Sequence, residues 1–189
     1  MAEPEAVNIF IVAEQFRNAG KLASLIPVMA SDIPALTGVS RMYLPTASMV
    51  SGALSLELYF KCLIRMRGKP YPRGHNLERL FHSIKPDDQV TIKRHFEEHS
   101  EQVQEYVERQ YRDSGRPLPK PNLFECCLFV SKDAFALLRY SFERGMPPDT
   151  GWLGDAIVEC ARQTILDEHP DWEGKNQTSP LPETSFRSR

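Results

Sequence analysis

The sequence of 189 residues has no long hydrophobic run, and its net charge of −2 is close to zero. No stretch approaches eighteen uninterrupted apolar residues, so we expect no membrane-spanning helix. The first residues, MAEPEAVN, lack a basic segment followed by an apolar one. We therefore expect no secretory signal and a cytoplasmic location. Because no overall charge draws the chain to nucleic acid or membrane, any such contact has to come from a local patch.

Cysteine is scarce, and its spacing argues against two common roles. The four cysteines are Cys62, Cys126, Cys127 and Cys160. Two close pairs that could flank a zinc ion are absent. Adjacent Cys126 and Cys127 point to different faces of a helix, so a disulfide between them would be strained. We expect four reduced, buried thiols, with no metal and no cofactor.

The pattern that is present is helical. Hydrophobic residues make up 41% of the chain and charged residues 25%, which suits a globular protein with a real core. Apolar spacing and Pro/Gly breaks predict six helices, near residues 5–26, 45–67, 76–84, 87–111, 122–145 and 152–169. Residues 170–189 lack periodic apolar positions and are predicted to be a disordered tail. The sequence therefore predicts an all-α fold, a compact bundle of five to six helices forming a single domain over residues 1–169.

The predicted helix 45–67 is apolar on almost every side, which is typical of a central, buried helix. Pro45 suits its first turn, and the helix should stop before Gly68. Small residues form a strip along it where another helix could approach closely: Ser48, Ser51, Gly52 and Ser55.

Charged residues interrupt two of these apolar helices. Glu57 and Lys61 are four residues apart, with the carboxylate first, which favours an ion pair on one helix face. Burying them costs several kcal/mol unless they pair with each other and with further donors. His75 follows after a short loop and should lie near them, either capping the next helix or bonding back to these charges. In the predicted helix 122–145, a stripe consists of Glu125, Lys132, Arg139 and Glu143. We interpret Glu57, Lys61, His75, Arg139 and Glu143 as a structural polar cluster that fixes helix register; the alternative is that they orient a site.

A basic run follows the second predicted helix. Residues 61–79 carry six Lys and Arg against the single acid Glu78, an excess of five positive charges. Tyr71 within the run could stack on a base. Such a patch could hold a nucleic-acid backbone by its phosphates. The candidate RNA-binding residues are Arg65, Arg67, Lys69, Tyr71 and Arg73. The alternative is that these cations only complement a helix dipole and are solvated.

The segment RHFEEH carries the candidate catalytic residues Arg94, His95 and His99. An imidazole can move a proton during attack by an RNA 2′-hydroxyl, while a guanidinium stabilises the charged transition state. Residues five apart diverge by about 140° on a straight helix, so Arg94 and His99 would have to act across a dimer interface or with His95. Five glutamates within residues 97–108 make the segment locally acidic. The alternative interpretation is a solvated helix face.

Taken together, these motifs resemble the HEPN superfamily (higher eukaryotes and prokaryotes nucleotide-binding) over residues 45–145. The matching residues are Glu57, Lys61, Gly74, His75, Asn76, Leu77, Arg139, Tyr140 and Glu143. The resemblance implies a compact helical bundle, often dimeric, of toxin–antitoxin or phage-defence type. Many members are metal-independent endoribonucleases whose signature is an arginine followed at short spacing by a histidine, which Arg94 and His99 match. The implied partners are a second copy, RNA, or a protein such as an antitoxin. The alternative function is a non-catalytic helical interaction or dimerisation module.

Overall fold

The computed structural model describes residues 3–29, 43–114, 117, 118, 120, 122–139 and 152–175. Its elements are α1 (Glu3–Met29), α2 (Tyr43–Met66), α3 (Leu77–Ser83), α4 (Pro86–Glu98), α5 (Glu101–Ser114), α6 (Leu123–Ser131), α7 (Ala134–Arg139), α9 (Asp155–Glu168) and the 3₁₀ turn η3 (Pro170–Trp172). These residues form no strand, so the all-α prediction is confirmed for the described part of the chain.

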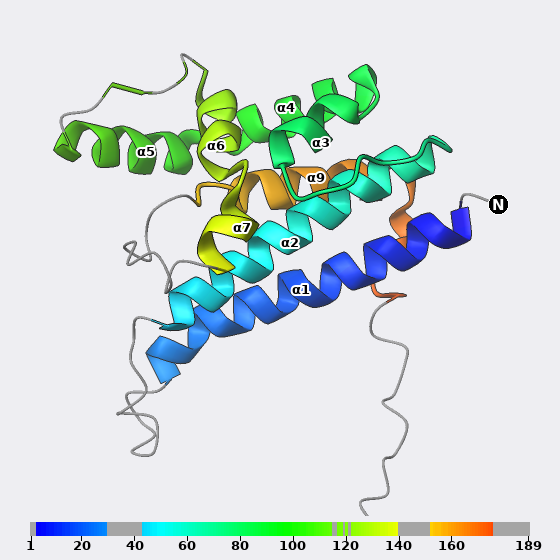
Figure 1. Ribbon diagram of the computed structural model, residues 1–189, viewed down its shortest axis with the longest axis horizontal. Coiled ribbons are helices and arrows are strands. Elements are labelled where there is room, and N and C mark those ends of the chain that lie inside the picture. Colours follow the sequence, from blue (N-terminus) through cyan, green and yellow to red (C-terminus); the bar gives the residue numbers. More distant parts are fainter. Residues whose placement is uncertain are drawn as a thin grey trace, which may run out of the picture.

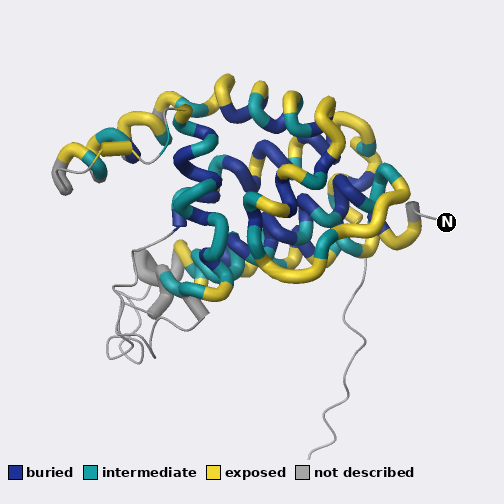
Figure 2. Tube along the Cα trace, turned by 45° about the horizontal axis from the view of Figure 1, so that its top comes forward, coloured by how far each residue is buried: buried dark blue, intermediate teal, exposed yellow. Residues whose placement is uncertain are grey.

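Helix α2 is the centre of the bundle. It packs against α1, α3, α7 and α9, and α1 runs antiparallel beside it (Figure 1). The tube in Figure 2 shows buried residues concentrated along these central helices. Seven apolar residues of α2 are at most 1% exposed: Ala53, Leu56, Tyr59, Phe60, Cys62, Leu63 and Ile64. The predicted central position of this helix is confirmed.

Small residues allow α1 to approach α2 closely. Ala6, Ala13 and Gly20, seven apart along α1, are buried. A Cβ on Gly20 would lie 3.2 Å from the Ser48 carbonyl oxygen and 3.3 Å from the Ser51 Cβ. The predicted small-residue strip of α2 is therefore the place where α1 approaches it.

The predicted helix 87–111 is two helices. The chain leaves α4 at His99, and the Ser100 carbonyl accepts from the Gln104 amide at 2.7 Å to begin α5. Serine is favoured just outside a helix start, and Glu101 in the first turn complements the helix dipole. Helix α5 extends beyond the other helices of the bundle (Figures 1 and 2).

The predicted helix 122–145 is interrupted as well. Its cap is confirmed, because the Asn122 side chain accepts from the Glu125 amide. A turn at Lys132 and Asp133 separates α6 from α7, and the Lys132 carbonyl accepts from the Leu77 amide at 2.8 Å. This break provides an acceptor for the start of α3. Residues 140–151 lie outside the described residues, so the predicted end at 145 stays a prediction.

The ordered chain continues past the predicted domain end at residue 169. Trp172 is 2% exposed, stacks on His169 with ring centroids 4.2 Å apart, and contacts Phe10 of α1 at 5.6 Å. The disordered-tail prediction is therefore wrong for residues 170–175. A single tryptophan packs on α1, and one residue gives no periodic apolar pattern from which this packing could be predicted. Residues 176–189 lie outside the described residues.

Two further sequence predictions meet the structure here. All four cysteines are free and buried, as expected. By length and hydropathy the segment Thr46–Met66 could cross a membrane, contrary to the expectation of no such helix. More than half of its most apolar window is buried inside the bundle, and a core helix of a soluble protein meets the same criteria.

Candidate functional site

The Glu57 carboxylate is the centre of the polar cluster at the end of α2. It is 2% exposed and accepts hydrogen bonds from Lys61 Nζ at 2.5 Å and from His75 Nδ1 at 2.8 Å. The predicted ion pair is confirmed. Of the two roles open to His75, the structure has the bond back to Glu57, while the side chain of Asn76 caps α3 by accepting from the Arg79 amide. The buried charge thus has two donors, as its burial requires.

The loop between α2 and α3 carries this histidine to the surface. Gly68 and Gly74 have φ of +69° and +105°, a conformation that glycine adopts without strain. The His75 side chain is 50% exposed, and its ring lies 4.5 Å from that of Phe135. Lys61 lies over the Tyr71 ring at 5.4 Å. Within the described residues, nothing bonds the second ring nitrogen of His75, Nε2.

Two residues of the predicted stripe, Glu125 and Lys132, have other partners than Glu57. Glu125 pairs with Lys93 of α4 at 2.7 Å, and Lys132 lies over the Phe129 ring at 4.1 Å. The Lys93 hydrogen bond holds the pKa of Glu125 below its ordinary value. The Arg139 side chain and all of Tyr140 and Glu143 lie outside the described residues, so their roles stay predictions.

The basic run divides into neutralised and unpaired cations. Arg65 pairs with Glu5 of α1 at 2.5 Å, and Arg67 bonds both Asp88 and Glu168 at 2.6 Å. By contrast, Lys69, Arg73 and Arg79 form no ion pair with any described residue. Arg65 and Arg67, two predicted RNA-binding residues, therefore also tie α2 to α1, α4 and α9.

The Arg67 bridge predicts a pH-dependent part of stability. Its hydrogen bond holds the pKa of Glu168 below the ordinary value of 4.5. A lowered folded pKa means that this contribution is complete above the unfolded pKa and is lost as the pH falls through the folded one. Arg67→Met is expected to cost about 1–3 kcal/mol at neutral pH, mainly because the buried Asp88 loses a charged hydrogen bond. Half-exposed Glu168 adds less than about 1 kcal/mol.

Urea unfolding near neutral pH and in strong acid measures this contribution. The difference in free energy of unfolding between Arg67→Met and the wild type should be smaller in acid. Arg65→Met is the matched control, because its partner Glu5 is exposed. An equal gap at both pH values would contradict the bridge's role.

The three candidate catalytic residues lie near one another at the end of α4 but do not converge. Arg94 is 56% exposed and pairs with Glu98 at 3.2 Å. His95 is buried, and its Nε2 bonds Asp167 of α9 at 2.8 Å. His99 has left the helix, and its Nδ1 bonds the His95 carbonyl oxygen at 2.9 Å.

Carboxylates surround this group. His95 Nδ1 also lies 3.5 Å from Glu98. Burial raises the pKa of Asp167, but hydrogen bonds from Gln163 and His95 outweigh it and hold the pKa below its ordinary value. Asp167 is therefore charged near neutral pH, and with Glu98 it makes the vicinity of Arg94 and His95 anionic.

A cavity of about 310 Å³ opens beside the two histidines. Its lining residues are His95, His99, Ala156, Glu159, Cys160 and Gln163. Burial, with Glu159 and Glu98 nearby, raises the pKa of the Cys160 thiol to about 12, which favours the protonated thiol near neutral pH. Within the described part of the chain, no three His, Cys, Asp or Glu side chains are grouped to hold a metal ion.

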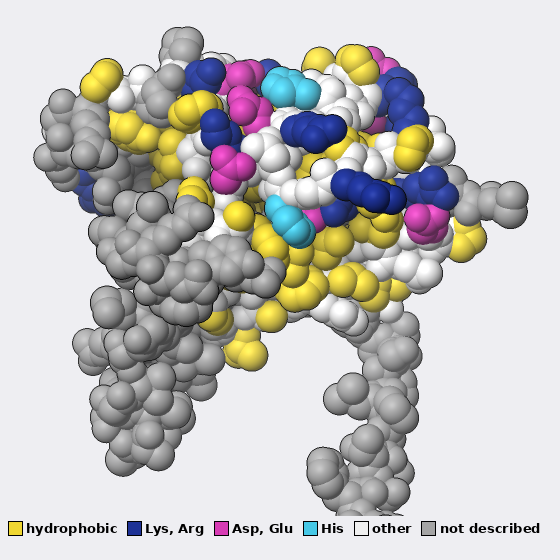
Figure 3. All heavy atoms as spheres, viewed as in Figure 1, with side chains coloured by type: hydrophobic (Ala, Val, Ile, Leu, Met, Phe, Trp, Pro, Cys, Tyr) yellow, Lys and Arg dark blue, Asp and Glu magenta, His cyan; other side chains and the backbone are white. Residues whose placement is uncertain are grey.

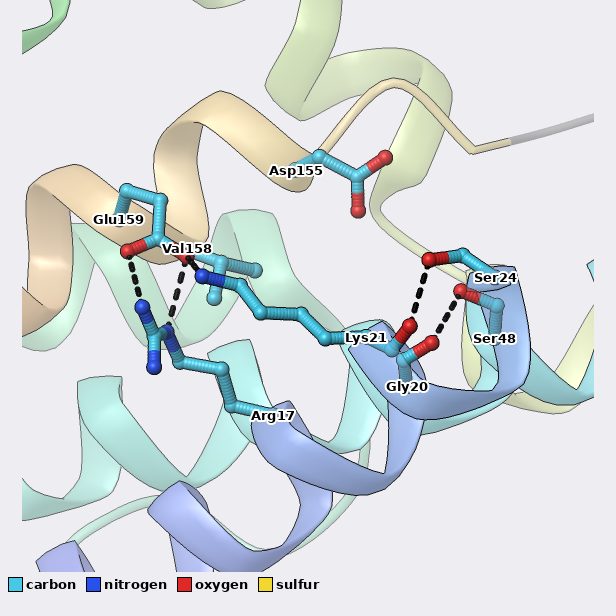
Figure 4. Close-up of a pocket in the computed structure, with 8 residues that line it drawn as sticks. All are labelled: Arg17, Gly20, Lys21, Ser24, Ser48, Asp155, Val158 and Glu159. Atoms are coloured by element: carbon cyan, nitrogen blue, oxygen red, sulfur yellow. Dashed lines mark hydrogen bonds and ion pairs between the residues drawn. The ribbon is translucent and has the colours of Figure 1, made fainter. Parts of the chain in front are cut away.

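A second cavity, of about 330 Å³, lies between α1, α2 and α9. Figure 4 shows Arg17 and Lys21 of α1 both reaching Glu159, at 2.7 and 3.1 Å. The hydroxyls of Ser24 and Ser48 donate to backbone carbonyls of α1. Asp155 accepts from the Trp152 indole. Each of these polar groups has a partner within the chain, so we interpret this cavity as part of the packing between helices and not as a binding site.

Asp167, which bonds His95 of α4, and Glu159, which pairs with Arg17 and Lys21 of α1, are not among the residues predicted from the sequence. Their signal was available, since Glu159, Gln163 and Asp167 are four residues apart and so share one face of α9. Which helix that face meets depends on the packing of α4 against α9.

Comparisons with protein-family models, with curated proteins and with solved structures found no match to this chain. The resemblance to the HEPN superfamily therefore stays a prediction that rests on the motifs of residues 45–145.

Proposed function

We propose that the chain is a HEPN-like helical protein that binds RNA through the loop between α2 and α3. The observation that carries this proposal is the set of cations on and beside the loop, Lys69, Arg73 and Arg79, which have no ion-pair partner among the described residues. Tyr71 lies among them and is 37% exposed. By the same resemblance, we propose a role of toxin–antitoxin or phage-defence type.

The distribution of charge favours RNA binding at the α2–α3 loop rather than at the end of α4. Lys and Arg side chains gather over the loop that follows α2, beside a histidine and a band of hydrophobic side chains (Figure 3). At α4, Arg94 is already paired with Glu98. An RNA backbone is attracted by cations whose charge is not cancelled within the protein. An exposed tyrosine adds a stacking surface for an unpaired base.

Binding of a labelled single-stranded RNA, followed by fluorescence anisotropy over a range of salt concentrations, tests the proposal. Lys69→Ala with Arg73→Ala is expected to weaken binding at least tenfold and to reduce the salt slope by about 1 per cation removed. Tyr71→Ala should weaken binding by about 1–3 kcal/mol without changing that slope.

The matched control removes two cations elsewhere, Arg94→Ala with Arg112→Ala, both of which pair with glutamates of their own helices. Equal losses in the two double variants would mean that only net charge matters. If the wild type binds no RNA, the remaining proposal is a non-catalytic module that binds a partner protein or a second copy.

A second candidate is a metal-independent endoribonuclease that uses Arg94, His95 and His99. The hydrogen bond that Asp167 accepts from His95 favours it, because a carboxylate that orients an imidazole is a common acid–base arrangement. The carboxylates around it oppose the approach of phosphate, so this candidate ranks below RNA binding at the α2–α3 loop.

A further inference from the structure

Among the described residues outside the α4 group, His75 is also oriented by a carboxylate, and this carboxylate, Glu57, is buried. Glu57 accepts from His75 Nδ1 at 2.8 Å. In the neutral imidazole this bond places the proton on Nδ1 and leaves the lone pair on Nε2. Lys61 holds the same carboxylate at 2.5 Å, so Glu57 has little freedom to turn away. The result is a fixed imidazole whose basic nitrogen has no described partner.

The position of this nitrogen suits a large substrate. Half of the His75 side chain is exposed, while Glu57 beneath it is buried. His95 has the opposite character, with its side chain only 10% exposed and its Nε2 occupied by Asp167. Since a general base must reach the proton that it removes, His75 is accessible to a polymer where His95 is not.

The charges near the two histidines differ in sign. Arg73 lies two residues before His75 and Arg79 four residues after it, and neither pairs with a described acid. The acids beside His75 already have partners, because Glu57 bonds Lys61 and His75, and Asp133 accepts from Asn76. Near His95 the chain supplies Asp167 and Glu98. A phosphodiester, which carries a negative charge, is therefore attracted to the first and repelled by the second.

We propose that His75, positioned by Glu57, is the acid–base residue of an RNA-cleaving site on the α2–α3 loop. This proposal rests on RNA binding at the same loop. His75 Nε2 takes the proton of a ribose 2′-hydroxyl, and the 2′-oxygen attacks the adjacent phosphorus. The bond from phosphorus to the 5′-oxygen breaks, and that oxygen takes a proton from water. The products are a 2′,3′-cyclic phosphate end and a 5′-hydroxyl end, with no net change in electrons or protons once His75 returns its proton to solvent.

The cations and Glu57 have separate parts in this step. Arg73 and Arg79 stabilise the charge that gathers on the phosphoryl oxygens as the bond to phosphorus forms. Glu57 is a positioning residue, because it touches the imidazole and not the substrate. Its carboxylate stabilises the imidazolium that forms as the proton arrives, as an aspartate does for a catalytic histidine.

The experiment follows cleavage of a labelled single-stranded RNA by the purified full-length chain in chelator, with RNA affinity measured in parallel. His75→Ala is expected to slow cleavage about one hundred- to ten thousand-fold and to leave the affinity nearly unchanged. Added imidazole should restore part of the rate, which a purely structural role of His75 would not predict. Glu57→Gln should lower kcat with little change in KM, and the wild-type product should carry a 2′,3′-cyclic phosphate.

His75 is half exposed, so its replacement should leave the fold intact, and circular dichroism melting of each variant checks this. Two matched variants, Arg94→Ala and His99→Ala, separate the two candidate sites. Loss of cleavage in these but not in His75→Ala would assign cleavage to α4 and overturn the present proposal. RNA that is bound but not cleaved by the wild type would overturn it too, while leaving RNA binding intact. A wild type that neither binds nor cleaves RNA would overturn both proposals.

Discussion

Trp172→Ala is expected to lower the free energy of unfolding by about 3–5 kcal/mol, and Tm by about 10 °C. The indole is buried between His169 and Phe10, so its removal leaves a cavity against α1. The 3₁₀ turn that carries it has only three residues and offers no other large side chain to fill that cavity. The loss should appear as a lower urea midpoint with an unchanged m value.

Leu22→Ala on α1 is the control for this variant. Leu22 is 60% exposed, and its truncation should change stability by no more than about 0.5 kcal/mol. If Trp172→Ala behaved like Leu22→Ala, residues 170–175 would not pack on α1, and the end of the ordered domain would return to residue 169.

Features that depend on local spacing could be predicted from the sequence. The Glu57–Lys61 pair follows from two residues one helical turn apart, and the Asn122 cap from a side chain that suits a helix start. The strip around Ser48 and Gly52 also follows from spacing along one helix. In the first two cases the partners lie within a few residues of each other. In the third, a strip of small residues predicts close approach by another helix without specifying which one.

Features that depend on which faces meet could not be predicted. At the break, the Lys132 carbonyl accepts from Leu77, more than fifty residues earlier in the chain. His95 finds Asp167 only because α4 packs against α9. Periodicity identifies an apolar face but not the helix that packs on it. For the same reason, the pairing of Arg67 with two acids distant in sequence could not be predicted.

Glu14→Ala is the second substitution with a large expected effect, about 3–5 kcal/mol. Glu14 of α1 is 4% exposed, accepts from the Tyr59 hydroxyl of α2, and accepts from Arg162 Nε of α9 at 2.9 Å. Removing the carboxylate leaves the buried Tyr59 hydroxyl without this acceptor and the largely buried Arg162 with exposed Glu173 as its remaining ion-pair partner, at the point where three helices meet. Thermal and urea unfolding measure the loss.

Part of this loss comes from the polar groups left unpaired, and part from the lost ion pair itself. A set of variants separates the two contributions to the free energy of unfolding. Glu14→Leu with Arg162→Met and Tyr59→Phe removes all three polar groups and keeps most of the volume. Because exchanging a buried ion pair for apolar residues is often neutral or stabilising, this triple variant should recover most of the stability lost in Glu14→Ala. It should also be less sensitive to alkali. Burial and the Glu14 hydrogen bond raise the pKa of Tyr59 above its ordinary value of 10, so its contribution is complete below that pH and is lost as the pH rises further. A triple variant as unstable as Glu14→Ala would mean that the charges themselves hold α1, α2 and α9 together.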